Sequence, residues 1–359
     1  MNFIDEIKSY VQDLDFGSRV FFSDPKYECF EIDGNKFVEI KSSDLTSTLS
    51  SEFSKYPACI FIDGGNAEII LSPGFSVSLI RLGAVAYNGR KKLFAKRSQH
   101  YCLVKSVIED GKIFYNAKLV VDDSSSKGLL DNDEMKIDSM DGTIREGIHR
   151  GSISKVAGIV RRLAELKLAI ELCSENENAI IVLDGSLQAS SSRECECLDV
   201  LYGIAKKNFC NVIGLCKTNT LLTEKGFPVS FALENKAKSR HVGKWCYKVA
   251  SSKNKDHIAD IYFAKLHEKS SRAFRMDVFN GIEINDNINS IMESLSANSV
   301  DATFLGYPYG LVEADKIARV SNSESEILKT RTKAKLGSKW KSFEALENNI
   351  NAHDVLDRM

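Results

Sequence analysis

The order of the segments between residues 58 and 321 restricts the fold more than any other feature of the sequence. Four runs rich in β-branched residues and separated by turn residues come first, at 58–65, 67–72, 75–89 and 100–121, and EDG at 109–111 within the last run predicts a hairpin turn. A long helical repeat follows at about 143–174. The remaining segments are strand patterns at 179–187, 211–218, 245–251, 260–267 and 272–279, helices at about 193–208 and 286–297, and a strand, a turn and a helix within 301–321. This order predicts an α/β fold with a mixed sheet flanked by helices.

The chain divides into three predicted parts. An N-terminal helical extension at 1–50 carries an apolar stripe over residues 3–14, which is too narrow to form a core alone. We expect this stripe to pack on a partner or, equally, on the edge of its own sheet. The central domain at 51–321 includes an acidic, Ser-rich stretch at 122–142 that predicts an exposed loop, and 322–359 predicts a charged helical tail.

Composition excludes several classes of protein. Of the 359 residues, 43% are hydrophobic and 27% are charged, which is typical of a globular protein. The nine cysteines are an odd number and offer only one C-x-C pair, so they predict reduced thiols rather than disulfides or a zinc site. The first residues, MNFIDEIK, do not resemble a signal peptide, and no apolar run is long enough to span a membrane. We therefore expect a cytoplasmic protein.

Two apolar runs end in an aspartate followed by glycine. FIDGG places Asp63 at the predicted end of one strand, and VLDGSL places Asp184 at the end of another. Because ligands of open α/β sheets bind where strands end, these two carboxylates predict a site in a crevice. The simpler alternative is two tight turns that use Asp as a turn residue. Asp-Gly turns of this kind also hold phosphate and metal in proteins of the sugar-kinase and actin type.

Further candidates lie on the predicted helices. Glu165 is close to the apolar stripe of the long helix, so it either points to the strand ends or forms a surface pair with Arg161 or Arg162. Tyr307 and Tyr309 flank Pro308 at a predicted strand-to-helix break, and Asp315 follows eight residues after Tyr307, about two helical turns later. The alternative there is an aromatic pair that closes the core, with Glu313 and Asp315 on a solvated face.

Carboxylates gathered without Cys or His form a site of hard oxygen ligands. Such a site selects Mg²⁺ or Mn²⁺ over Zn²⁺. Two such ions about 4 Å apart activate a water molecule and stabilise the leaving oxygen in phosphodiester hydrolysis. Asp63 is the best candidate to bridge them.

Positive charge is clustered although the net charge is only −1. The first cluster contains Lys236, Lys238, Arg240 and Lys244, with the aromatic residues Trp245 and Tyr247 beside it, and the second runs from Lys329 to Lys341. Basic clusters bind phosphate backbones and aromatic residues stack on bases, so these segments predict DNA contacts. The alternative is an ordinary solvated face.

Taken together, these motifs resemble the NurA nuclease family of archaea and some bacteria. The resemblance spans about 58–320 and rests on FIDGG at 61–65, the Arg-rich helix with Glu165, VLDGSL at 182–187, IGLCK at 213–217 and YPYGLVEADKIARV at 307–320. It implies a ribonuclease H-like fold and a Mn²⁺-dependent DNA nuclease, with Mg²⁺ as the other candidate ion.

The resemblance also implies functional residues and partners. It implies a homodimer that works with a HerA-type hexameric ATPase in DNA end resection and double-strand break repair. The expected activity is exonucleolytic in the 5′ to 3′ direction, and single-strand endonuclease activity is compatible with it. By position, Asp63, Glu165 and Asp184 correspond to the metal carboxylates, Tyr307 to the family's active-site tyrosine, and Lys217 to a lysine that follows a strand.

One position departs from the family pattern. Asp315 stands where the family usually has His, so this position could bind a metal ion only through oxygen, which leaves metal preference and rate open. A catalytically weakened, DNA-binding scaffold for the ATPase is therefore the alternative to the nuclease. A phosphotransferase would need a Gly-rich nucleotide loop, and the sequence contains neither G-x-x-x-x-G-K-[ST] nor G-x-G-x-x-G.

Overall fold

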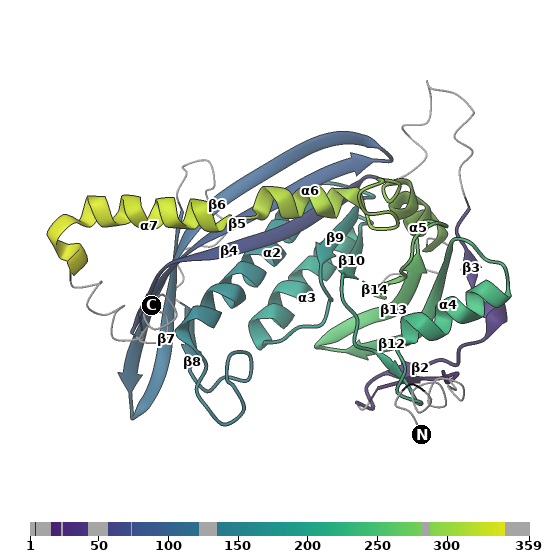
Figure 1. Cartoon of the computed structure of the whole chain (residues 1–359), viewed down its shortest axis with the longest axis horizontal. Coiled ribbons are helices and arrows are strands. Elements are labelled where there is room, and N and C mark those ends of the chain that lie inside the picture. The colour runs from purple at the N-terminus through teal and green to yellow at the C-terminus, as the bar shows by residue number, and fades with distance from the viewer. Residues whose placement is uncertain are drawn as a thin grey trace.

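A computed structural model describes residues 4, 16–22, 24–41, 57–72, 74–121, 135–281 and 288–341. Within these residues the chain forms one large mixed sheet with helices on both faces, which confirms the predicted α/β class (Figure 1). The strands are β1 (Val20–Phe21), β2 (Glu28–Cys29), β3 (Val38–Glu39), β4 (Cys59–Ser72), β5 (Phe75–Asn88), β6 (Lys91–Glu109), β7 (Lys112–Val121), β8 (Met135–Asp138), β9 (Ile180–Asp184), β10 (Asn211–Cys216), β11 (Leu222–Thr223), β12 (Trp245–Asn254), β13 (His257–Lys265) and β14 (Phe274–Val278). The helices are α2 (Val156–Glu175), α3 (Ser192–Lys207), α4 (Val229–Ser239), α5 (Ile288–Ala297), α6 (Tyr309–Ala318) and α7 (Asn322–Leu336).

The centre of the sheet combines an antiparallel meander with parallel strands. The strand order through the described sheet is β2-β12-β13-β14-β10-β9-β4-β5-β6-β7-β8, and β3 also pairs with β12. β9 is parallel to both β4 and β10, and the neighbouring pairs are antiparallel. The connection from β9 to β10 through α3 is the crossover that parallel neighbours require. The carboxyl ends of β9 and β10 therefore meet at one edge of the sheet.

Apolar side chains fill both faces of the sheet. One cluster lies between the sheet and α2 and α3, a second lies under α5 and α6, and a third lies under α4. Figure 1 shows α6 and α7 running along the face of β4 and β5, with α2 and α3 below the same strands. None of the helices in the described ranges combines the length and the apolar composition needed to cross a membrane.

The β6–β7 turn confirms one sequence prediction in detail. Asp110 and Gly111 connect the strands, with φ values of 49° and 72°. Two consecutive positive φ angles are typical of the tight turns that match the twist of a hairpin. The predicted motif at 109–111 therefore forms the expected hairpin.

The long helix begins later than predicted. Residues 143–152 form turns instead of the first helical turns, and α2 starts at Val156 after a short 3-10 turn. Gly147 has a φ of 60°, which a helix cannot include, and the Ser152 side chain caps the 3-10 turn by accepting a hydrogen bond from the Ser154 amide.

Two strand predictions are also corrected. Residues 58–65 and 67–72 form the single strand β4, because pairing with β5 continues to Ser72. Residues 301–306 form turns instead of a strand: the Asp301 carboxylate accepts a hydrogen bond from the Thr303 amide, and Gly306 has a φ of 86°.

Other predictions fall wholly or partly outside the described residues. These are the apolar stripe at 3–14, apart from Ile4, residues 122–134 of the acidic stretch, and residues 342–359 of the tail. Residues 135–138 of the predicted loop form β8 at the end of the sheet. Residues 16–41 of the N-terminal part place β2 and β3 beside β12.

Candidate active site

Asp63 is a buried carboxylate within β4. The sequence predicted that Asp63 ends a strand, and this was wrong. Asp63 immediately follows Ile62, which is the last residue of β4 that pairs with β9. Asp63 is only 5% exposed, and its Oδ1 accepts a hydrogen bond of 2.8 Å from the Gly64 amide. Burial, followed by the negative charges of Asp184 and Glu165, raises the pKa of Asp63 to about 7.

Asp184 ends β9 as predicted and is tied to Lys217, which follows β10. The Lys217 ammonium lies 2.8 Å from Asp184 Oδ2 and 3.9 Å from Asp63 Oδ2, so one cation lies between the two carboxylates. Burial alone would lower the pKa of Lys217, but its hydrogen bond to Asp184 and the nearby negative charges raise it. Lys217 therefore stays protonated at neutral pH.

Glu165 is buried on α2 rather than exposed. Arg161 forms an ion pair with one oxygen of Glu165, and Arg162 lies 3.3 Å from the other. The pairs that the alternative predicted are therefore present, but the Glu165 carboxylate is buried and not on the surface. Burial raises the pKa of Glu165 and the two arginines oppose that rise. Any side chain at Gly64 would collide with this carboxylate, because a Cβ there would lie 2.5 Å from Glu165 Oε1. The glycine is therefore what allows α2 to approach β4.

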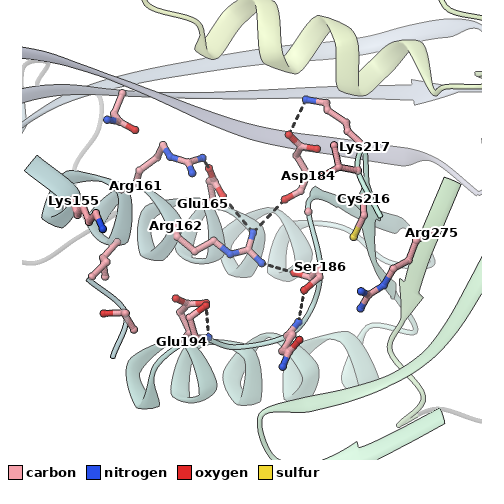
Figure 2. A pocket seen from close by; sticks show the side chains of 18 of the residues that line it. Lys155, Arg161, Arg162, Glu165, Asp184, Ser186, Glu194, Cys216, Lys217 and Arg275 are labelled. Carbon is pink, nitrogen blue, oxygen red and sulfur yellow. Dashed lines mark hydrogen bonds and ion pairs between the residues drawn. The ribbon is translucent and has the colours of Figure 1, made fainter. Parts of the chain in front are cut away.

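Arg162 also fixes the loop that follows Asp184. Its guanidinium donates to the carbonyl oxygens of Ser186 at 2.8 Å and Asp184 at 3.4 Å, as Figure 2 shows. This one side chain therefore connects α2, Glu165 and the carboxyl end of β9.

Tyr307 lies just before α6 and is 1% exposed. It packs edge-on against Phe274, at 5.2 Å between ring centroids, so it does close the core. Its hydroxyl is nevertheless a buried group without a hydrogen-bond partner in the described part of the chain. Burial, followed by the charges of Asp184, Asp63 and Asp315, raises the pKa of this phenol.

Asp315 lies on α6, near enough for its charge to affect Lys217 and Tyr307. Its carboxylate forms an ion pair with Arg319, one turn further along the helix. Glu313 points elsewhere and pairs with Lys92 and the Tyr87 hydroxyl. Asp315 is thus close to the other carboxylates of the site, but its own carboxylate is already paired with Arg319.

A cleft of about 1090 Å³ opens beside this group of residues, although Asp63, Tyr307 and Asp315 are not among the described residues that line it. Glu165, Asp184 and Lys217 line it together with the basic residues Lys155, Arg161, Arg162 and Arg275 (Figure 2). The cleft therefore combines buried carboxylates with a wall of positive charge, which suits a phosphate-containing ligand.

Lys155 and Arg275 escaped the sequence analysis. Arg275 belongs to β14, where its Nε and Nη2 donate to Asp277 at 2.8 and 3.0 Å. Asp277 is fully buried and also binds His257 Nε2 at 2.9 Å. Burial alone would raise the pKa of Asp277, but His257 and Arg275 hold it below its ordinary value. Two opposite charges, Arg275 and Asp277, inside a predicted strand were the signal that could have identified this site residue.

The predicted metal ligands are already engaged by cationic side chains. Among the residues that the structure describes, no three Asp, Glu, His or Cys side chains lie close enough together to hold one ion. The physical reason is that Lys217 pairs with Asp184, Arg161 and Arg162 pair with Glu165, and Arg319 pairs with Asp315.

The first basic cluster differs from the prediction in its aromatic residues. Lys236, Lys238 and Arg240 are exposed at the end of α4, and Lys244 is half-buried. Trp245 and Tyr247 are each 1% exposed and belong to the core under α4, so they cannot stack on bases. Strand alternation points both residues inward, which the sequence analysis overlooked.

Comparison with known proteins identifies the fold. No protein-family model and no curated protein matches the sequence. The crystal structure of the NurA nuclease from Sulfolobus solfataricus aligns with a TM-score of 0.52 and 14% identity, over 93% of each chain. Endonuclease V from Ciona intestinalis, bound to a DNA containing inosine followed by ribo-adenosine, aligns with a TM-score of 0.36 and 15% identity, over 80% of this chain and 91% of that one. The first of these likenesses shows that this chain has the fold of the NurA nuclease, a ribonuclease H-like mixed sheet flanked by helices.

Proposed function

We propose that this protein is a metal-dependent deoxyribonuclease that hydrolyses phosphodiester bonds in the cleft. The observation that carries the proposal is the placement of Asp63 beside Asp184. Asp63 is a buried carboxylate with a pKa of about 7, and it lies just beyond the point where β4 and β9 stop pairing. A fold shared with a nuclease supports the same reaction class.

The donor set fits a hard divalent cation. Asp63, Asp184 and Glu165 offer only oxygen, and Tyr307 places an unpartnered buried hydroxyl near them, where the hydration shell of an ion would satisfy it. Asp63 and Asp184 would hold the ion, with Asp63 as the bridging ligand if there are two, and Mn²⁺ or Mg²⁺ would activate water and stabilise negative charge. Asp315 is a further ligand only if its pair with Arg319 opens.

The protein's own residues have distinct roles in this proposal. Asp63, whose pKa is about 7, would hold the ion as a carboxylate, and its proton would leave to solvent. Lys217 turns from Asp184 toward the phosphate and neutralises charge there. Arg161 and Arg162 oppose the rise that burial causes in the pKa of Glu165 and hold its carboxylate in place, and Arg162 also holds the backbone after Asp184.

The finer parts of the function rest on the resemblance to the NurA family. We infer 5′ to 3′ exonuclease activity on DNA ends, action in a homodimer, and partnership with a HerA-type hexameric ATPase that supplies ATP hydrolysis for double-strand break repair. The absence of a nucleotide-binding motif in this sequence supports placing the ATP site on the partner.

The direct test measures cleavage of end-labelled single-stranded and double-stranded DNA with Mn²⁺, Mg²⁺ or EDTA. Asp63→Asn and Asp184→Asn are expected to lower the cleavage rate by a factor of about 100 or more, because each removes a charge that holds the ion. Asp199→Asn is the matched control, since Asp199 is exposed on α3, and it should cleave at the wild-type rate.

Rates within about threefold of wild type in either site variant would contradict the assignment, since threefold is under about 1 kcal/mol of barrier. A wild-type protein that binds DNA without cutting it under any metal condition would instead support the scaffold alternative.

A further inference from the structure

A second, smaller pocket lies directly beside the cleft. Its volume is about 340 Å³, and Cys216, Lys217 and Arg275 line both spaces. We call it the side pocket, and Asn219, Phe231, Glu234 and Ala273 also line it. The size is at the lower end of the range for small-molecule sites, which suits one nucleobase and its sugar better than a duplex.

Asn219 lines this pocket and carries a donor that is unsatisfied among the described residues. Its Oδ1 accepts a 3.0 Å hydrogen bond from the Leu221 amide, and this bond fixes which end of the side-chain amide is oxygen. Its Nδ2 is buried and has no partner in the described part of the chain. A buried donor without a partner costs free energy, so it points to an acceptor supplied by a ligand. Every nucleobase carries such acceptors on its edges.

Phe231 supplies an aromatic surface to the same pocket. It belongs to α4, remains 45% exposed and meets Phe16 edge-on at 4.9 Å between ring centroids. Unlike Trp245 and Tyr247, this ring is therefore accessible for stacking. Stacking on an aromatic side chain accepts every base, because every base has a π face.

Arg275 stands at the boundary between the two spaces. Its Nε and Nη2 are bound to Asp277, and its Nη1 donates to no protein group among the described residues. Asp277 is itself held by His257, so the guanidinium is fixed before any ligand arrives. The one carboxylate in the pocket, Glu234, is turned to the backbone by a 3.0 Å hydrogen bond from the Ala273 amide. A phosphate can therefore approach Arg275 and Lys217 without opposing an unpaired carboxylate in the pocket.

We propose that the side pocket binds the base of a nucleotide whose phosphate lies at Lys217 and Arg275. Phe231 stacks on the base and Asn219 Nδ2 donates to its edge, so a single strand enters the cleft with one base turned aside. This inference rests on the proposed nuclease function and adds a subsite that reads the presence of a base, not its identity.

The test uses binding alone, in EDTA, so that it does not depend on cleavage. The probes are two hexamers of abasic deoxyribose phosphate, one without any base and one carrying a single 2-aminopurine at the third position. A lone base can reach the pocket whichever register the backbone takes, and 2-aminopurine fluorescence falls when the base stacks. Anisotropy of an end label gives the affinity of each probe for the full chain.

Wild-type protein is expected to bind the probe with the base about tenfold more tightly than the bare backbone and to quench its fluorescence. Phe231→Ala should reduce this gain to less than about threefold and relieve the quenching. Asn219→Asp keeps the acceptor for Leu221 and removes the donor. This variant should also reduce the gain in affinity that the base provides. Any charge repulsion weakens the binding of both probes equally, so it cancels in the ratio of their affinities.

Phe209→Ala is the matched control. Phe209 is 70% exposed and lies before the start of β10, at the end of that strand opposite Lys217. This variant should keep the full gain. An equal affinity of wild type for both probes, or an undiminished gain in Phe231→Ala, would overturn the subsite. If the protein binds the probe with the base more tightly but does not cut DNA, the subsite is supported and the nuclease function is contradicted. If the protein cuts DNA but binds both probes equally, the nuclease function is supported and the subsite is contradicted.

Discussion

At the scale of single residues, the site is governed by the balance of charge around Asp63. Two carboxylates approach it, and the Lys217 ammonium offsets only part of their effect because it lies 3.9 Å from Asp63 and bonds to Asp184 instead. Burial, followed by these like charges, therefore keeps the proton on Asp63 up to a pH of about 7. In the proposed nuclease this proton would be released when a cation binds.

Asp63 should make stability depend on pH in a defined direction. Because its pKa is raised from 3.8 to about 7 on folding, protonated Asp63 contributes stability at low pH that is lost as pH rises through about 7. In EDTA, Asp63→Asn should therefore raise the melting temperature at pH 8 by about 2 °C or more, and the difference should shrink toward pH 4. Melting curves between pH 4 and 8 measure this, and Mn²⁺ should stabilise only the wild type. A difference that stays constant with pH would contradict the shifted pKa.

At the scale of elements, glycine positions allow α6 to lie against the sheet. A Cβ at Gly83 would lie 2.6 Å from the Ala314 carbonyl oxygen, and one at Gly310 would overlap the Phe61 ring. The Ala314 carbonyl belongs to the backbone and cannot turn aside, and the Phe61 ring is fully buried in the core, so both positions require hydrogen. This close packing sets the height of α6, and with it the place of Tyr307, above β4 and β5.

Gly83→Ala should push α6 outward. We expect a loss of about 1–3 kcal/mol in the free energy of unfolding, which chemical denaturation would measure, and a slower nuclease if α6 carries part of the site. Gly203→Ala is the control, because Gly203 is an exposed interior residue of α3 with nothing within 4 Å of its added Cβ, and it should stabilise by up to about 1 kcal/mol. Equal stability of the two variants would show that α6 tolerates displacement.

At the scale of the whole molecule, positive charge lies on two separate helices. Lys236, Lys238 and Arg240 extend from the same helix, α4, that lines the side pocket with Phe231, whereas Arg331 and Lys335 lie on α7. A strand that leaves the cleft through the side pocket would therefore meet the α4 charges first.

Charge reversal of Lys236, Lys238 and Arg240 should weaken DNA binding and flatten its dependence on salt. Each lost phosphate contact lowers the slope of log K against log salt by about 0.7–0.9. Reversal of Arg331, Lys335 and Lys339 tests the other helix in the same titration. A slope that changes only with the α7 set would move the DNA path away from α4, and an unchanged slope in both would make these residues ordinary solvated charges.

Local pattern was sufficient for the order of elements and for much of the candidate site. The apolar runs that end at Asp184 and Cys216 predicted β9 and β10, because a buried parallel strand is recognisable from its own residues, and strand-end chemistry then selected Asp63 and Asp184 as candidates. Glu165 was a candidate from its place beside the apolar stripe of a helix, Tyr307 from the strand-to-helix break at Pro308, and Lys217 only from the resemblance to the NurA family. That these candidate residues lie close together in space could be predicted only by assuming a particular fold.

Tertiary structure decided what depends on contacts distant in sequence. Asp63 lies within a strand because β5 pairs past it, Trp245 and Tyr247 are internal because of the face that β12 turns to α4, and Arg275 and Asn219 face one space because β14 and β10 are neighbours. Periodicity describes one segment at a time, whereas register and burial depend on which segments meet. The sequence by itself therefore determined the elements and most candidate residues, and the tertiary structure decided their charge partners, their exposure and the pocket beside them.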